Sequence, residues 1–104
     1  MHTVMWTFKV PAGTTKADLV STIKATAHNY LGVPGLVRKY YGIGEDANSI
    51  VGIYLWESKA AAEALYTADW VATVRKRWGS EPVRQEWSTP MVVESAERRL
   101  VEAR

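Results

Sequence analysis

The sequence predicts an α+β domain in which the elements follow the order β-α-β-β-α-β. Two observations carry this prediction. Residues 50–56 form an uncharged run rich in β-branched and aromatic side chains, which is typical of a strand. Residues 14–31 instead repeat apolar side chains at the helical period. This order favours a four-stranded antiparallel sheet with helices on one face.

The composition excludes several classes of protein. A chain of 104 residues is expected to form one domain, over residues 1–104. With 47% apolar and 23% charged residues it is not expected to be disordered, and a net charge of +2 does not indicate a nucleic-acid partner. Cysteine is absent, which excludes disulfides and thiol catalysis. The lack of a long apolar span or leader predicts a cytoplasmic protein that does not contact a membrane.

The first half of the chain predicts a strand, a helix and a second strand. Residues 3–10 alternate apolar side chains, and Pro11 and Gly13 end the strand. Thr14 or Thr15 can cap a helix that continues to Leu31. Residues 36–43 form the second strand, and a polar loop over 44–48 leads into the strand at 50–56.

The second half predicts helices and a final strand. Ser58 is expected to cap a short alanine-rich helix, and Asp69 a second helical segment over 70–78 that ends at Gly79. Residues 83–93 read as the fourth strand. Residues 94–104 form a tail, in which a short amphipathic helix over 95–104 is expected on the surface or on a partner. The whole corresponds to a ferredoxin-like βαββαβ domain.

The strand at 50–56 is apolar on both faces. One face carries Tyr54 and Trp56, and the other carries Val51, Ile53 and Leu55. The predicted helices are enough to cover only one of these faces. A second copy of the sheet is therefore expected to cover the other, which predicts a homodimer.

The chain resembles the dimeric α/β-barrel superfamily, in which two ferredoxin-like protomers pack sheet against sheet. Within it the chain is similar to the YdhR-type monooxygenases, relatives of the antibiotic-biosynthesis monooxygenases. The resemblance rests on residues 34–36 (Pro-Gly-Leu), on 52–56 (Gly-Ile-Tyr-Leu-Trp) and on 58–66. It implies a small homodimer with a cleft between sheet and helices, no metal or bound cofactor, and oxidation of aromatic polyketide-like substrates by dioxygen. It also implies that haem degradation is disfavoured, since that branch uses a strand-one asparagine and a later histidine, both lacking here.

Aromatic side chains are the first candidates for a substrate-binding cleft. The chain holds five tryptophans and five tyrosines against one phenylalanine. Tryptophan and tyrosine combine a large apolar body with a polar group, which suits pockets and interfaces. Six of them could converge between sheet and helices, although each could equally be a core or interface residue: Trp6, Phe8, Tyr54, Trp56, Trp70 and Trp78.

Polar candidates for catalysis are few. Tyr40 beside Arg38 could donate to a substrate oxyanion, although both could simply protect an edge strand from unwanted pairing. Arg77 could bind a carboxylate or phenolate, or lie along the surface. His28 could act as a general base but is expected to face solvent. His2 is expected in a frayed terminus, and two lone histidines do not make a metal site.

These residues and the resemblance together predict a cofactor-independent monooxygenase that acts on a small aromatic or polyketide-like substrate. Such a reaction requires the protein to hold an electron-rich substrate, assist its deprotonation and exclude water. Two other functions remain open at this point: a cyclase or isomerase of the same fold, and a non-enzymatic small-molecule binding or stress-response protein.

Overall fold

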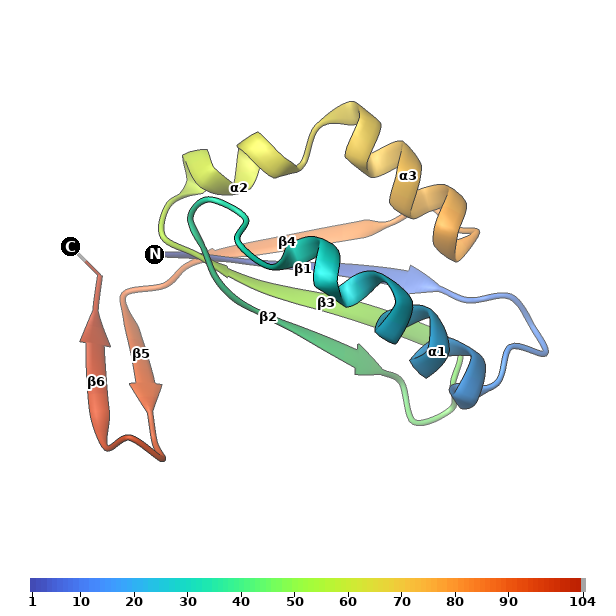
Figure 1. The fold of residues 1–104 in the computed structure, drawn as a ribbon, viewed down its shortest axis with the longest axis horizontal. Coiled ribbons are helices and arrows are strands. Elements are labelled where there is room, and N and C mark those ends of the chain that lie inside the picture. The colour runs from blue at the N-terminus through green and yellow to red at the C-terminus, as the bar shows by residue number, and fades with distance from the viewer. Residues whose placement is uncertain (104) are drawn as a thin grey trace.

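The structure is a computed structural model that describes residues 1–103. A four-stranded antiparallel sheet has the strand order β2-β3-β1-β4. Helices cover one of its faces and a separate two-stranded hairpin lies at one end (Figure 1). The elements in chain order are β1 (His2–Lys9), α1 (Lys16–Thr26), η1 (Ala27–Tyr30, a turn of 3₁₀-helix), β2 (Leu36–Ile43), β3 (Ser49–Trp56), α2 (Lys59–Leu65), α3 (Ala68–Trp78), β4 (Val83–Ser88), β5 (Met91–Glu94) and β6 (Arg99–Glu102).

The helix boundaries follow from local capping interactions. Thr15 and Asp18 form a reciprocal capping box at the start of α1. Ser58 caps α2, as predicted, by accepting a hydrogen bond from the Ala61 amide. Gly79 ends α3 in the left-handed conformation. The cap of α3 was expected at Asp69 and lies instead at Thr67, whose hydroxyl accepts from the Trp70 amide, while Asp69 lies in the first turn.

Two expected helices differ from the structure. The first helix ends at Thr26 and tightens into η1, so Leu31 is 81% exposed and does not join the apolar stripe. The expected tail helix over 95–104 is wrong for the residues described, because β6 pairs antiparallel with β5 and Val101 lies opposite Val92. So short a helix has little stability without packing, whereas the hairpin satisfies its backbone hydrogen bonds. Arg104 lies outside the described residues.

The fourth strand is also shorter than predicted. It ends at Ser88 rather than at residue 93, two residues before Pro90. Proline has no amide hydrogen and therefore cannot continue a sheet ladder. The chain turns away at this point, where the Thr89 amide donates to the Met1 carbonyl, and β5 begins a separate hairpin.

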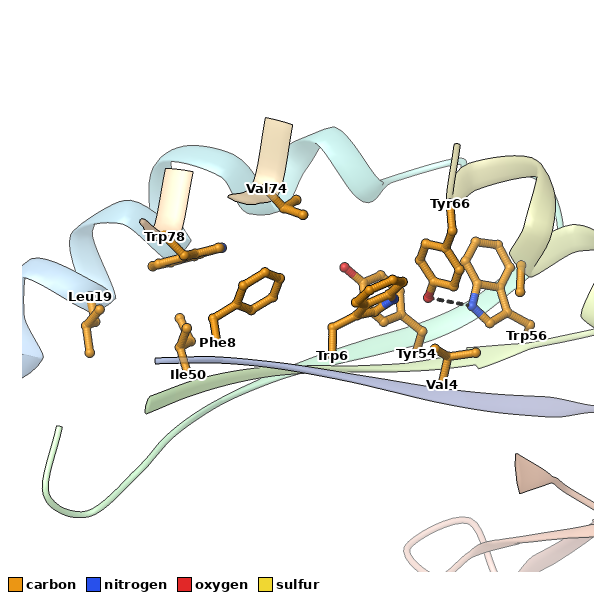
Figure 2. Packing of buried hydrophobic residues seen from close by; sticks show 11 residues of the cluster. Val4, Trp6, Phe8, Leu19, Ile50, Tyr54, Trp56, Tyr66, Val74 and Trp78 are labelled. Carbon is orange, nitrogen blue, oxygen red and sulfur yellow. Dashed lines mark hydrogen bonds between the residues drawn. The ribbon is translucent and has the colours of Figure 1, made fainter. Parts of the chain in front are cut away.

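Buried side chains lie between the sheet and its helices (Figure 2). Val4, Trp6 and Phe8 of β1 point toward the helices, as do Tyr54 and Trp56 of β3. The opposite side of the sheet, which we call the helix-free face, carries Met5, Val51, Ile53, Tyr40, Val83 and Trp87 by strand alternation and register. Within residues 1–103, no helix is long and apolar enough to cross a membrane.

Candidate functional site

A small inner cavity lies between the helix side of the sheet, η1 and α3. Its volume is about 20 Å³, and tyrosines, tryptophans, Lys39 and Arg77 contribute to its walls. A cavity of this size has room for a single water molecule. An aromatic substrate can therefore enter only if side chains around the cavity move.

Lys39 of β2 is the central polar side chain of this cavity. Its Nζ lies 3.3 Å from the ring centroid of Tyr30, 4.0 Å from that of Tyr41 and 4.5 Å from that of Tyr54. We call these three rings the tyrosine cage. Nζ also donates a hydrogen bond of 2.9 Å to Tyr41 Oη. The amine thus lies among rings contributed by η1, β2 and β3.

Removal from water sets the charge of Lys39. Desolvation, with a smaller contribution from the positive charge of Arg77, lowers the pKa of Lys39 from 10.5 to about 6. The ring faces of the tyrosine cage oppose this shift because they attract a cation, by about 0.5–2 kcal/mol in general. With a pKa of about 6, the amine is mostly neutral at pH 7.

The tyrosines around the amine keep their protons. Burial raises the pKa of Tyr54 well above its ordinary value, and it raises the pKa of Tyr41 as well. Both therefore remain neutral phenols at physiological pH, able to donate hydrogen bonds. The cavity then holds one neutral amine and one cation, Arg77. Among the described residues, no carboxylate lines it.

Two larger pockets adjoin the inner cavity. The first, which we call the outer pocket, has a volume of about 380 Å³ and lies between η1, the loop at 31–32 and the start of β2. It shares Tyr30, Lys39 and Tyr41 with the inner cavity, so these side chains form the wall between the two. The second, about 310 Å³, lies between α1 and the end of α3 and shares Arg77 and Trp78. Both are within the size range of small-molecule sites.

The predicted aromatic residues converge on the helix side of the sheet, but only some reach the cavity. Phe8, Tyr54, Trp70 and Trp78 contribute to its walls. Trp6 and Trp56 lie deeper in the core and contribute to none of the pockets described above. Both belong to the buried cluster between the sheet and the helices.

Trp56 forms a buried hydrogen bond within this cluster. It is fully buried, and its indole nitrogen donates to Tyr66 Oη at 3.0 Å (Figure 2). Burial raises the pKa of Tyr66, which therefore remains a neutral hydroxyl that accepts this bond. The pair fixes the junction between β3 and the end of α2.

The predicted polar residues are separated in space. Arg77 of α3 lies at the inner cavity. Tyr40 is 54% exposed and, by register with Ile53, lies on the helix-free face, so it does not reach the cleft of its own chain. His28 is exposed on η1. Neither of these two is brought together with Arg77.

His2 lies in an ordered strand rather than in a frayed terminus. Its side chain is largely buried, and Nε2 lies 2.7 Å from Glu86 Oε1 on the neighbouring strand β4. Glu86 in turn pairs with Arg84. Within the described part of the chain, no group of three or more His, Cys, Asp or Glu side chains is placed to hold a metal ion.

Lys39, Tyr30 and Tyr41 were not predicted as site residues. The reason is a β-bulge between Leu36 and Arg38, where the register of β2 against β3 shifts by one residue. Simple alternation from Leu36 places Arg38 and Tyr40 toward the helices, whereas the bulge brings Lys39 and Tyr41 there. Leu36 and Ile43 both pack against the core although they are seven positions apart, an odd spacing that regular alternation would place on opposite faces. This spacing of two apolar residues was the signal of the bulge in the sequence.

The fold is that of the antibiotic biosynthesis monooxygenases. Neither a protein-family model nor a curated protein matches the chain. Comparison with solved structures finds a protein from Deinococcus radiodurans assigned to that class, with a TM-score of 0.68 and 11% identity over 90% of this chain and 97% of the other. SnoaB, a cofactor-independent oxygenase from Streptomyces nogalater, matches with a TM-score of 0.65 and 23% identity over 90% and 97% of the two chains.

Another protein of this fold binds a porphyrin. A variant of MhuD with two manganese protoporphyrin IX molecules bound per active site matches with a TM-score of 0.66 and 17% identity, over 91% of this chain and all of the other. At these identities the likeness establishes the fold. Function must be argued from the site itself.

Proposed function

We propose that this protein is a cofactor-independent monooxygenase that oxidises a small phenolic aromatic compound with dioxygen. The observation that carries the proposal is the cleft between sheet and helices. It combines aromatic walls, a largely enclosed amine on Lys39 and the guanidinium of Arg77. The fold shared with SnoaB, itself a cofactor-independent oxygenase, supports the same reaction class.

The reaction requires a site that favours an electron-rich anion. Loss of a proton from a phenol or from the CH₂ group of an anthrone gives an anion that can donate electrons to dioxygen. In the anthrone case the carbon loses two hydrogens and gains one oxygen atom, and the second oxygen atom leaves as water. Aromatic walls orient the ring by stacking, and a cation opposite the oxygen stabilises the anion.

The aromatic side chains lining the inner cavity are proposed to hold the substrate ring. Phe8, Tyr54, Trp70 and Trp78 contribute rings from β1, β3 and α3. Trp70 is only half-buried, so it can shift to admit a ligand without disrupting the fully buried core. Tyr40 and His28 have no part in this proposal because neither lies at the cleft.

Oxygen consumption tests this function directly. Purified protein is incubated with a panel of hydroquinones and anthrones in an oxygen electrode, with the uncatalysed autoxidation of each compound as the blank. We expect uptake of one dioxygen per quinone formed, faster than the blank, and a lower rate for Trp70→Ala. Turnover without oxygen uptake would instead establish a cyclase or isomerase, and ligand binding without turnover a binding protein.

We also propose that the working unit is a homodimer formed through the helix-free face. Tyr40, Val83 and Trp87 on this face are 54%, 59% and 49% exposed. Large apolar groups concentrated on one side of a sheet are typical of an interface. The proposed partner is a second copy of the same sheet, since a two-fold interface pairs a surface with itself.

A further inference from the structure

We infer that Lys39 Nζ is the base that accepts the proton of the substrate, and that Arg77 holds the oxyanion that this transfer creates. This inference rests on the proposed oxidation of a phenolic compound and names the residues that activate it. It is drawn from the position of the amine between the two spaces that a ligand can occupy. Lys39 contributes to the walls of both the inner cavity and the outer pocket.

The surroundings of the amine leave it available to a substrate proton. Its hydrogen-bond partner is the Tyr41 hydroxyl, and within residues 1–103 no carboxylate forms an ion pair with Lys39 or Arg77. A lysine already paired with an acid would stay protonated and could not serve as a base. Lys39 instead resembles the desolvated lysines that act as bases near neutral pH.

The groups that face the amine come from every element packed around it. Tyr30 comes from η1, Tyr41 from β2, Tyr54 from β3 and Arg77 from α3, while β1 contributes the apolar Phe8. The tyrosines are neutral phenols and Arg77 is a cation. Because none of these groups carries a full negative charge, no ionic repulsion opposes an anion that enters the cavity, and Arg77 attracts it.

The proton transfer makes use of the tyrosine cage. In the step, the substrate O–H bond breaks, its proton forms a new N–H bond on Lys39, and the electron pair stays on the substrate oxygen. The ammonium so formed lies against three ring faces that attract a cation, and Arg77 faces the new oxyanion. These interactions are stronger after the transfer than before it, which is the condition for accelerating a step.

Ionisation of a bound phenol tests the inference without any turnover. The probe is 4-nitrophenol, whose anion is yellow, and its visible spectrum is recorded with excess protein about one pH unit below its own pKa. We expect the wild-type protein to raise the anionic fraction several-fold over that in buffer. Lys39→Met is expected to abolish this increase, whereas Lys24→Met, the same change on the exposed surface of α1, is expected to retain it.

The pH profile of oxygenation provides the second readout. With a substrate that turns over, kcat/KM is expected to rise as pH increases through about 6 in the wild-type protein, because the free amine is the active form. In Lys39→Arg this limb is expected to disappear and the rate to fall about 10²–10⁴-fold, the usual contribution of a general base. Arg77→Met is expected to retain the limb and to weaken binding of the anion.

These outcomes separate the two proposals. If the wild-type protein ionises 4-nitrophenol but consumes no oxygen with any compound, the assignment of the base stands and the monooxygenase assignment fails. If oxygen is consumed and Lys39→Met keeps both the rate and the ionisation within about twofold, the role of Lys39 as a base is overturned. Absence of any spectral change when the wild-type protein is raised to millimolar concentration over the probe also overturns it.

Discussion

Lys39 is expected to lower the stability of the fold, and its proposed role as a base gives a reason for its presence at the cavity. A methionine of similar length would fill the space between the rings without a desolvation penalty. The native lysine must instead lose a proton or bury a charge. A residue that destabilises the fold at a cavity is expected where function depends on it.

Lys39→Met is therefore expected to stabilise the protein. Between pH 6 and 10.5 the unfolded chain binds more protons at this position than the folded one, because the folded pKa is about 6 and the ordinary value is 10.5. The contribution of Lys39 to stability thus rises with pH across this window and is flat below it. At pH 7 the variant is expected to gain about 1–4 kcal/mol in the free energy of unfolding and to lose this rise.

Denaturant unfolding between pH 6 and 9 measures both effects, with Lys24→Met as the control. An unchanged or lower stability of Lys39→Met at pH 7 would show that the amine is charged in the folded protein. If the free energy of unfolding of Lys39→Met depends on pH as that of the wild-type protein does, the Lys39 amine keeps its ordinary charge in the folded protein.

The hydrogen bond between Trp56 and Tyr66 gives a second prediction at the scale of single residues. Tyr66→Phe removes the acceptor and leaves the indole N–H unpaired in a fully buried position. Such a loss is expected to lower the free energy of unfolding by about 1–3 kcal/mol. Tyr40→Phe deletes the hydroxyl of a half-exposed side chain, whose long hydrogen bond comes from an Arg38 that also pairs with Glu94, and is expected to stay within about 0.5 kcal/mol of the wild type. Chemical denaturation compares them, and equal stabilities would contradict the role of the buried bond.

At the scale of elements, α2 approaches the sheet closely at Gly35. A β-carbon at this position would lie 2.5 Å from Ala61 Cβ, and the backbone has a φ of +77°. Both the steric contact and the left-handed conformation therefore require glycine. Ala61 of α2 permits this approach because its side chain is a single methyl group.

Gly35→Ala is expected to destabilise the protein by more than the strain of the left-handed conformation alone, which is about 1–2 kcal/mol. Adding Ala61→Gly removes the steric contact but not the backbone strain, so the double variant is expected to recover only part of the loss. Thermal unfolding of the two single variants and the double variant measures the coupling. If the double variant recovers all of the lost stability, or none of it, the destabilisation does not consist of a steric contact plus backbone strain.

The main elements were predictable from the sequence because each carries its own local pattern. The apolar run of β3, the capping threonine of α1 and the closing Gly79 all act within a few residues. The bulge in β2 and the β5–β6 hairpin depend instead on pairing with a neighbouring strand. Local patterns in the sequence therefore did not indicate that Lys39 faces the helices, and the amphipathic pattern over 95–104 misassigned the tail.

At the scale of the whole molecule, the helices cover only one side of the sheet. Ile53 lies near the centre of the helix-free face, opposite Met5 on one neighbouring strand and Tyr40 on the other. An aspartate there would have to lose its hydration in a sheet-to-sheet interface, at high cost. Ile53→Asp is therefore expected to convert the proposed dimer to a folded monomer.

Sedimentation velocity at micromolar concentration, with circular dichroism to verify folding, measures this change. Val20→Asp, which lies on α1 away from that face, is the control and is expected to remain dimeric. A wild-type protein that sediments as a monomer would exclude the dimer.

The volume of the inner cavity has a kinetic consequence. The inner cavity of the free protein has room for one water molecule and not for an aromatic ring. A ligand can therefore bind only after the side chains of Lys39, Arg77 or the surrounding rings have moved to enlarge the cavity. Stopped-flow association rates are then expected to level off with rising ligand concentration at the frequency of opening. An association rate that keeps growing linearly with ligand concentration would mean that the inner cavity is already open to the ligand in the free protein.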